Sequence, residues 1–284
     1  MLAVKQTTGR WDTAAVAGKW LGVRDLSQSS NQALWDGMNL YAAGRYAEAH
    51  AAFDKAVHGD KTSSAAYAWR ARAIYRLRPY DFSAVVEDCR RAIALDPGNA
   101  MAYFTRAMML TLQARYAEAL PDFDKAVNKK EMAAAAHNNR GLVYFYLHNP
   151  EAARKDFNRA IDLEPGYVFA YFNRGVLNAR ENRLEEALQD FNTVLDFTPD
   201  DPDALNNRGV VRRRMGGNAG AESDYLAAVR IAPKDPVAYY NLGNLYFSLG
   251  DFAGAEAEYR KVLALRPDYA AAADALQRTR LAQR

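Results

Sequence analysis

A proline recurs at a fixed interval along most of this 284-residue chain. Pro165 follows Pro97 by 68 residues, and a proline then returns every 34 residues at Pro199, Pro233 and Pro267. Self-similarity at a period of 34 residues predicts a stack of equivalent small units rather than one globular core. Such a stack buries its apolar residues between neighbouring units and exposes a long surface, so we look for function on that surface.

The period divides the chain into seven units when the recurring proline is placed at slot 32 of 34. In this alignment Ser64 and Ala65 fall between the first two units, and Glu131 replaces the proline of the third unit, where we expect a looser turn. The units are 30–63, 66–99, 100–133, 134–167, 168–201, 202–235 and 236–269.

Each unit contains two blocks of helical apolar periodicity joined by a short turn. Slots 8 and 20 hold small residues in most units, which lets two helices approach closely, and slot 24 holds a bulky ring in most units. In the last unit these positions are Gly243, Ala255 and Tyr259. Because proline ends the second block, each unit is predicted to be a helical hairpin.

The last unit reads Tyr239-x-x-Leu242-Gly243-x-x-Tyr246, then Ala255-x-x-x-Tyr259 and Pro267. This pattern resembles the tetratricopeptide repeat, and the resemblance covers residues 30–269. It implies an all-α, right-handed superhelical solenoid of seven hairpins that acts as a protein–protein interaction scaffold.

The two ends of the chain match no unit. Residues 270–284 are helix-prone and increasingly polar, so we expect a capping helix over the last hairpin. Residues 1–29 contain Trp11 and Trp20 and are interpreted either as an amino-terminal cap or as an arm that docks into a groove.

Arginine occupies slot 7 and aspartate occupies slot 23 in units two to six. Pairing within a unit uses every one of these residues, so we predict structural ion pairs between the two helices of each hairpin. The predicted pairs are Arg72–Asp88, Arg106–Asp122, Arg140–Asp156, Arg174–Asp190 and Arg208–Asp224.

Asparagine occupies slot 6 in four consecutive units, at Asn139, Asn173, Asn207 and Asn241. In the tetratricopeptide family this slot faces the concave groove. A side-chain amide both donates and accepts, so this row could hold the backbone of an extended peptide. The alternative is that these amides are solvated or bond locally.

Around the asparagines, the groove slots carry rings and arginines. We expect Phe104, Phe172 and Tyr240 to receive apolar side chains, and Arg180 and Arg214 to attract carboxylates. The predicted partner is therefore a protein or peptide with acidic and apolar groups. The alternative function is an oligomerisation or assembly module of an envelope or secretion complex, acting through the convex face or the termini; a homo-oligomer also stays open.

Other function classes find little support. A net charge of +3 and basic residues interrupted by acidic ones argue against nucleic acid, and no apolar run is long enough for a membrane span. The four histidines and the single Cys89 lack metal-ligand spacing, so we predict no metal, no cofactor and no enzymatic activity. The lone cysteine favours the cytoplasm; a removed signal peptide would instead indicate the periplasm.

Overall fold

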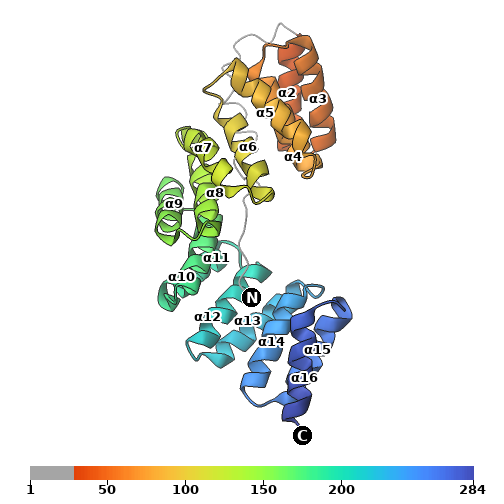
Figure 1. The fold of residues 1–284 in the computed structure, drawn as a ribbon, viewed down its shortest axis with the longest axis vertical. Coiled ribbons are helices and arrows are strands. Elements are labelled where there is room, and N and C mark those ends of the chain that lie inside the picture. Colours follow the sequence, from red (N-terminus) through yellow and green to blue (C-terminus); the bar gives the residue numbers. More distant parts are fainter. Residues whose placement is uncertain (1–28) are drawn as a thin grey trace. The chain divides into compact units, whose positions relative to one another are not determined.

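The computed structural model describes residues 29–284, and this part of the chain contains helices and no strands (Figure 1). The proposed arm or cap at residues 1–29 therefore lies outside the described residues, except for Ser29. The helices of the first four hairpins are α2 (Ser29–Ala42), α3 (Tyr46–Gly59), α4 (Ser64–Leu77), α5 (Phe82–Leu95), α6 (Ala100–Leu112), α7 (Tyr116–Ala126), α8 (Ala133–Tyr146) and α9 (Pro150–Leu163). Those that follow are α10 (Val168–Arg180), α11 (Leu184–Phe197), α12 (Pro202–Arg214), α13 (Asn218–Ile231), α14 (Pro236–Ser248), α15 (Phe252–Leu265) and α16 (Ala270–Ala282).

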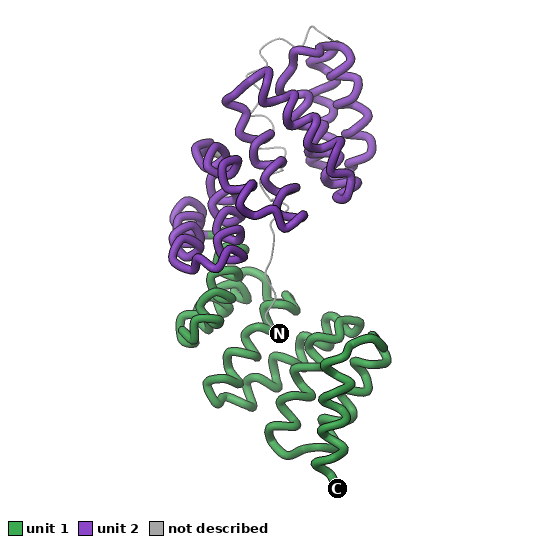
Figure 2. Tube along the Cα trace, in the orientation of Figure 1, with its two compact units in different colours: residues 1–5, 166–284 green, residues 6–165 purple. Residues whose placement is uncertain are grey.

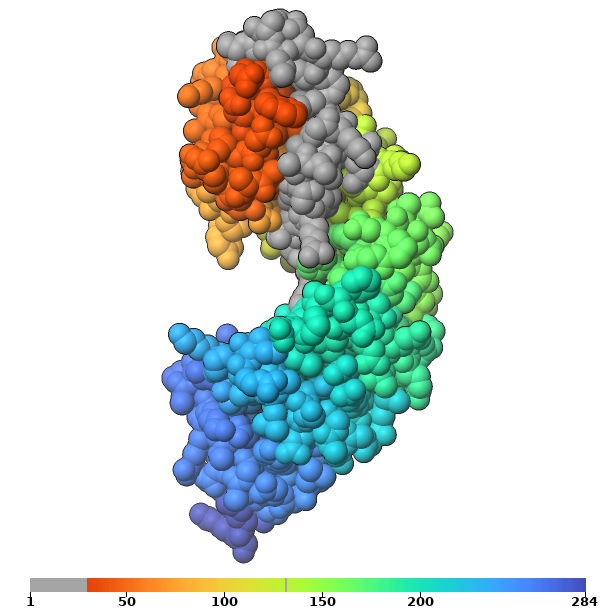
Figure 3. All heavy atoms as spheres, turned by 180° about the vertical axis from the view of Figure 1, so that it is seen from behind, coloured from red at the N-terminus to blue at the C-terminus, as the bar shows by residue number. Residues whose placement is uncertain are grey.

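Helices α2 to α15 pack in consecutive pairs, as predicted for helical hairpins. The described residues form two compact units, an amino-terminal unit of residues 29–165 and a carboxy-terminal unit of residues 166–284 (Figure 2). In the space-filling view, the colours inside each unit follow chain order, because each hairpin packs against its sequence neighbours (Figure 3).

Local sequence explains where the helices begin. Asp201 and Asp235 accept hydrogen bonds from the first-turn amides of α12 and α14, and proline occupies the first helical position at Pro202 and Pro236. Proline is favoured there because its missing N–H would have no helical acceptor, and an aspartate cap satisfies other free amides of the first turn.

A left-handed residue at slot 15 ends the first helix of six hairpins. Three of these residues are glycines, but Ala114, His148 and Asn182 also have φ of 56°, 57° and 60°. Left-handed backbone costs a non-glycine residue about 1–2 kcal/mol. The strain is compensated because the turn allows the second helix to pack against the first.

The second hairpin has a longer turn. Helix α4 begins at Ser64, so the two extra residues of the second unit lie in the turn between Leu77 and Phe82 and not before the hairpin. No residue of this turn has a positive φ, and Tyr80 at its tip is 95% exposed. The predicted register of α4 is therefore wrong by two residues, which moves Arg70 into slot 7 and Arg72 into slot 9.

The core repeats from hairpin to hairpin. In six hairpins the ring at slot 24 is buried, and in five of these it lies against a glycine at slot 8, as Tyr225 does against Gly209. A Cβ atom added to Gly209 would lie 2.6 Å from Cε1 of Tyr225, which explains the small side chain. In the third hairpin α7 ends early, and a 3₁₀ turn at Lys130–Met132 precedes α8, as expected where proline is replaced.

Helix α16 packs on α15 and buries Ala272, Ala275, Leu276 and Thr279. Its other side is exposed and carries Asp274, Gln277 and Arg278. The predicted capping helix is thus present, because one face covers the last hairpin and the other is polar.

We expect Ala114→Gly to stabilise the protein by about 0.5–1 kcal/mol, because glycine adopts the left-handed turn without strain. Thermal melting followed by circular dichroism measures the effect. As a control, Ala117→Gly in the first turn of α7 should destabilise by up to about 1 kcal/mol. Equal losses in both variants would contradict a strained turn at Ala114.

Candidate functional site

Arginine at slot 7 holds the two helices of a hairpin together. Arg106 donates from Nε and Nη2 to the two carboxylate oxygens of Asp122, at 2.7 and 2.6 Å. The same two-pronged arrangement joins Arg140 to Asp156, Arg174 to Asp190 and Arg208 to Asp224. Four of the five predicted pairs are therefore present.

The fifth predicted pair, Arg72–Asp88, is wrong. Asp88 instead receives hydrogen bonds from Nε and Nη2 of Arg70, at 2.8 and 2.7 Å. The reason is the misplaced insertion: once α4 begins at Ser64, Arg70 occupies slot 7. Arg72 is fully buried one position beyond the slot-8 alanine, where its guanidinium lies over the rings of Tyr75 and Phe104.

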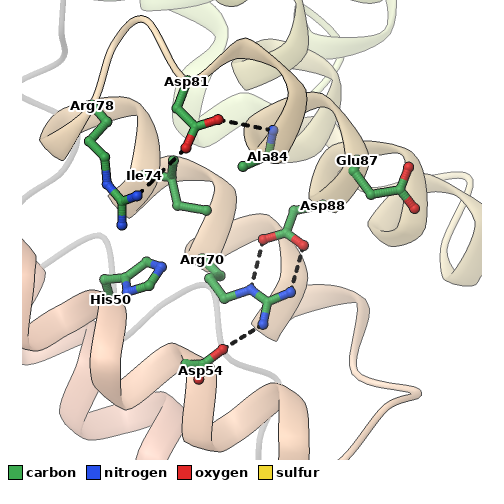
Figure 4. A pocket seen from close by; sticks show the side chains of 9 residues that line it. All are labelled: His50, Asp54, Arg70, Ile74, Arg78, Asp81, Ala84, Glu87 and Asp88. Atoms are coloured by element: carbon green, nitrogen blue, oxygen red, sulfur yellow. Dashed lines mark hydrogen bonds and ion pairs between the residues drawn. The ribbon is translucent and has the colours of Figure 1, made fainter.

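A second arm of the same arginine reaches the preceding hairpin, which the sequence interpretation did not predict. Nη1 of Arg70 donates to Asp54 of α3 at 2.7 Å (Figure 4). Nη1 of Arg140 likewise donates to Asp124 at 2.7 Å, and Nη1 of Arg208 donates to Asn192 at 2.9 Å. In each case the acceptor lies at slot 25, sixteen residues before the arginine. We call the arginine with its two partners an arginine clamp.

The arginine and its partner within the hairpin are largely shielded from water. The side chain of Arg140 is 18% exposed and that of Asp156 is 4% exposed, and His137 Nδ1 lies 2.8 Å from Asp156. Burial alone would raise the pKa of Asp156, but the hydrogen bonds from Arg140 and His137 outweigh it and lower the pKa below the ordinary 3.8. The carboxylate thus stays charged at neutral pH, as a structural ion pair requires.

The pocket beside the first clamp has a volume of about 370 Å³ and is lined by residues of α3, α4 and α5. Figure 4 shows His50, Arg78 and Asp81 around it, with Glu87 directed away. Its arginines and acids form ion pairs with each other, with the exception of Glu87, which pairs with Arg90. This arrangement is structural, and it offers no nucleophile with an adjacent base.

The predicted asparagine row is more buried than a solvent-facing ladder. Asn139, Asn173, Asn207 and Asn241 are 3, 1, 0 and 5% exposed. Asn139 donates to the carbonyl of Ala135 one turn earlier, and Asn241 donates to Oδ1 of Asn206 on α12 at 2.8 Å. Asn139 therefore makes a local hydrogen bond, which was the alternative interpretation, whereas Asn241 bonds the preceding hairpin.

Two of the three predicted aromatic anchors belong to the core. Phe104 and Phe172 are fully buried and meet Phe123 and Phe191 edge to face, at ring distances of 5.8 and 5.7 Å. They fill the hairpin interior because slot 5 faces the slot-24 ring when both are large. Their assignment as pockets for partner side chains is wrong.

Tyr240 is the predicted anchor that remains partly exposed. Its ring lies 5.9 Å from Tyr259 and 5.3 Å from Tyr269, so three tyrosines cluster on the last hairpin. Arg180 is exposed at the end of α10. Arg214 is exposed as well, but its guanidinium donates to the Ala179 carbonyl and to Asn182, so it also secures the end of α10.

Two further arginines act electrostatically on the tyrosine cluster, and the sequence interpretation did not select them. Burial raises the pKa of Tyr259 to about 12, and the charges of Arg278 on α16 and Arg213 on α12 oppose this shift. Arg213 also opposes the burial that raises the pKa of Tyr225 to about 12. The sequence could have indicated Arg213, because it occupies one of the repeat positions that face the groove in this family. Arg278 lies after the last repeat, so no repeat position could indicate it.

The described residues hold no group of three histidine, cysteine, aspartate or glutamate side chains that could bind a metal ion. Cys89 is fully buried, which strongly raises the pKa of its thiol and makes it unreactive. Within residues 29–284, no helix combines the length and apolar character that crossing a bilayer requires.

Sequence models described as tetratricopeptide repeat match residues 37–100, 138–202 and 236–269, more than half of the chain. The chain belongs to the tetratricopeptide repeat family. Repeats of this family are generally non-catalytic scaffolds for protein–protein interaction. A comparison with curated proteins finds no match.

Solved structures support the same fold. A structure of the APC/C hetero-tetramer Cut9–Hcn1 aligns with a TM-score of 0.68 and 13% identity over 93% of this chain, which spans 58% of that chain. PilF of Pseudomonas aeruginosa aligns with a TM-score of 0.65 and 20% identity over 75% of this chain and 96% of its own. YrrB, described as a tetratricopeptide repeat protein with an unusual peptide-binding site, aligns with a TM-score of 0.51 and 26% identity over 66% of this chain and 95% of its own.

We expect Asp156→Ala to destabilise the protein by about 3–5 kcal/mol, because it leaves the buried guanidinium of Arg140 without its main partner. Thermal melting measures the loss. The matched control is Asp124→Ala, which removes the other, 56% exposed partner of Arg140 and should cost about 1 kcal/mol or less. Similar losses in the two variants would contradict the division between a buried and an exposed arm.

The same carboxylate predicts a pH effect. Because its folded-state pKa is lowered, Asp156 contributes stability above pH 3.8 that is lost as the pH falls through the folded-state value. Urea unfolding at neutral pH and near pH 3 should therefore show a smaller acid-induced loss in Asp156→Asn than in the wild type. An equal loss would mean that this carboxylate is not the titrating group.

Proposed function

We propose that this protein is a non-catalytic scaffold that binds an extended, acidic segment of a partner protein on the inner face of its carboxy-terminal unit. By inner face we mean the exposed side of the first helices α10, α12 and α14, together with α16. Each of these helices contacts the next one in this series, so the face is continuous within the unit.

The observation that carries this proposal is the convergence of arginines on the tyrosine cluster. The positive charges of Arg213 on α12 and of Arg278 on α16, which also pairs with Asp274, lower the pKa of Tyr259 against the effect of burial. Tyr240 and Tyr269 remain partly exposed beside it. Partly exposed aromatic rings near positive charge suit a segment that presents a carboxylate next to an apolar side chain.

The rest of the face fits the same ligand. Arg180 and Arg214 are exposed near the ends of α10 and α12, and Asp203 is the acidic residue among the groove slots. Asn173, Asn207 and Asn241 recur on the same three helices at intervals of 34 residues, but they are buried, so we do not assign them to contact with the ligand. The similarity to YrrB, a repeat protein with a described peptide-binding site, supports this type of ligand.

The test uses peptides selected against the full chain from a random phage-displayed library. We expect the selected peptides to be acidic. The double variant Arg213→Glu, Arg278→Glu should lower their binding affinity at least about tenfold, as measured by fluorescence anisotropy. Arg278 is exposed and Arg213 is half-buried. Reversing their charges therefore removes the attraction for an acidic peptide and leaves the hairpin core in place.

The matched control is Arg230→Glu with Lys234→Glu, which makes the same charge change at exposed positions at the end of α13 and in the turn after it. This variant should retain wild-type affinity, and thermal melts check that both variants fold. Peptides that bind the two double variants equally well, or a selection without acidic residues, would reject the proposed face.

A further inference from the structure

One arginine clamp lacks its second arm. Arg106 donates from Nε and Nη2 to Asp122, as the other clamps do, but Nη1 makes no hydrogen bond among the described residues. Its side chain is 26% exposed, close to the 24% of Arg174 and above the 17% of Arg70 and 18% of Arg140.

The sequence explains the missing arm. The acceptors of the complete clamps are Asp54, Asp124 and Asn192, each sixteen residues before its arginine. The residue sixteen before Arg106 is Arg90, which cannot accept a hydrogen bond and instead pairs with Glu87 on the surface of α5. A cation thus replaces the carboxylate or amide found at the same position in the other clamps.

Arg106 lines a pocket of about 360 Å³. Its apolar wall is formed by Phe82 and Val86 of α5, Leu110 of α6 and Pro121 of α7. Arg106 and Arg115 line it together with their carboxylate partners Asp122 and Glu118. Arg115 is held by Glu118 and lies over the Phe82 ring. The pocket therefore combines an apolar wall with one unused guanidinium N–H.

We propose that this pocket binds an acidic side chain of a partner protein, whose carboxylate takes the place that Asp54 and Asp124 fill in the complete clamps. The complete clamps define the ligand chemistry, because the oxygens that complete them belong to carboxylates in two cases and to an amide in the third. A carboxylate also forms a stronger, charge-assisted hydrogen bond with a guanidinium than an amide does. The apolar wall accommodates the methylenes that carry the carboxylate.

This site differs from the inner face of the proposed function. It lies in the amino-terminal unit and uses slots 7 and 23, which carry the clamps, rather than the groove slots. The two proposals can therefore be tested separately, because none of the variants used for this pocket changes a residue of α10 to α16.

The probe is N-acetylglutamate amide, titrated into the isotope-labelled full chain while the Nε–Hε signal of Arg106 is followed by NMR. One charge-assisted contact with an apolar wall should give a dissociation constant of about 1–10 mM. We expect a saturable shift for this probe, and much weaker effects from N-acetylglutamine amide and from acetate. Equal shifts from acetate would overturn the assignment to a protein side chain.

Arg90→Asn provides the decisive variant, because it restores the acceptor that Asn192 supplies to Arg208. Its new amide should occupy Nη1 of Arg106, reduce probe affinity at least about tenfold and raise the melting temperature by about 2 °C. The control Arg91→Asn removes the same charge from the neighbouring exposed residue and should do neither. Unchanged probe binding in Arg90→Asn, or no wild-type shift at about 50 mM probe, would overturn the proposal.

Discussion

The hydrogen-bonded pairing of arginine with aspartate inside the five inner hairpins is the interaction on which this stack depends. A repeat protein has no distant contacts to fix its geometry, so every hairpin must be aligned by its own helices and its neighbours. The guanidinium suits this task because its fork fixes distance and angle at once. Buried partners such as Asp156 make the pair costly to break, whereas the exposed arm to Asp124 contributes orientation more than stability.

The clamps also mark how the ends of the stack differ from its middle. In the last hairpin Leu242 takes the arginine position and is buried with Tyr225 and Leu245. In the first hairpin Asp36 occupies the arginine position and accepts a hydrogen bond from Gln32 of the same helix. Terminal repeats meet a different neighbour from the inner ones, so the polar clamp gives way there to apolar packing or to a local hydrogen bond.

The period and the helical hairpins could be predicted from sequence, because small residues, rings and prolines recur at fixed slots. The register of α4 could not, since two inserted residues fit equally well before the hairpin or inside its turn until Arg70 is seen on Asp88. Phe104 and Phe172 were misassigned because slot number alone does not tell whether a ring at the helix edge turns inward. Arg278 was missed because the site extends past the last repeat.

The longer turn of the second hairpin has a practical consequence. The two extra residues of this turn leave both flanking helices in register, and Tyr80 projects almost entirely into solvent. Exposed loop tips of this kind tolerate additional chain. A fluorescent tag or a small reporter domain inserted at this position would leave the stacking of the hairpins intact, and would allow partner capture to be followed without modifying either proposed binding surface.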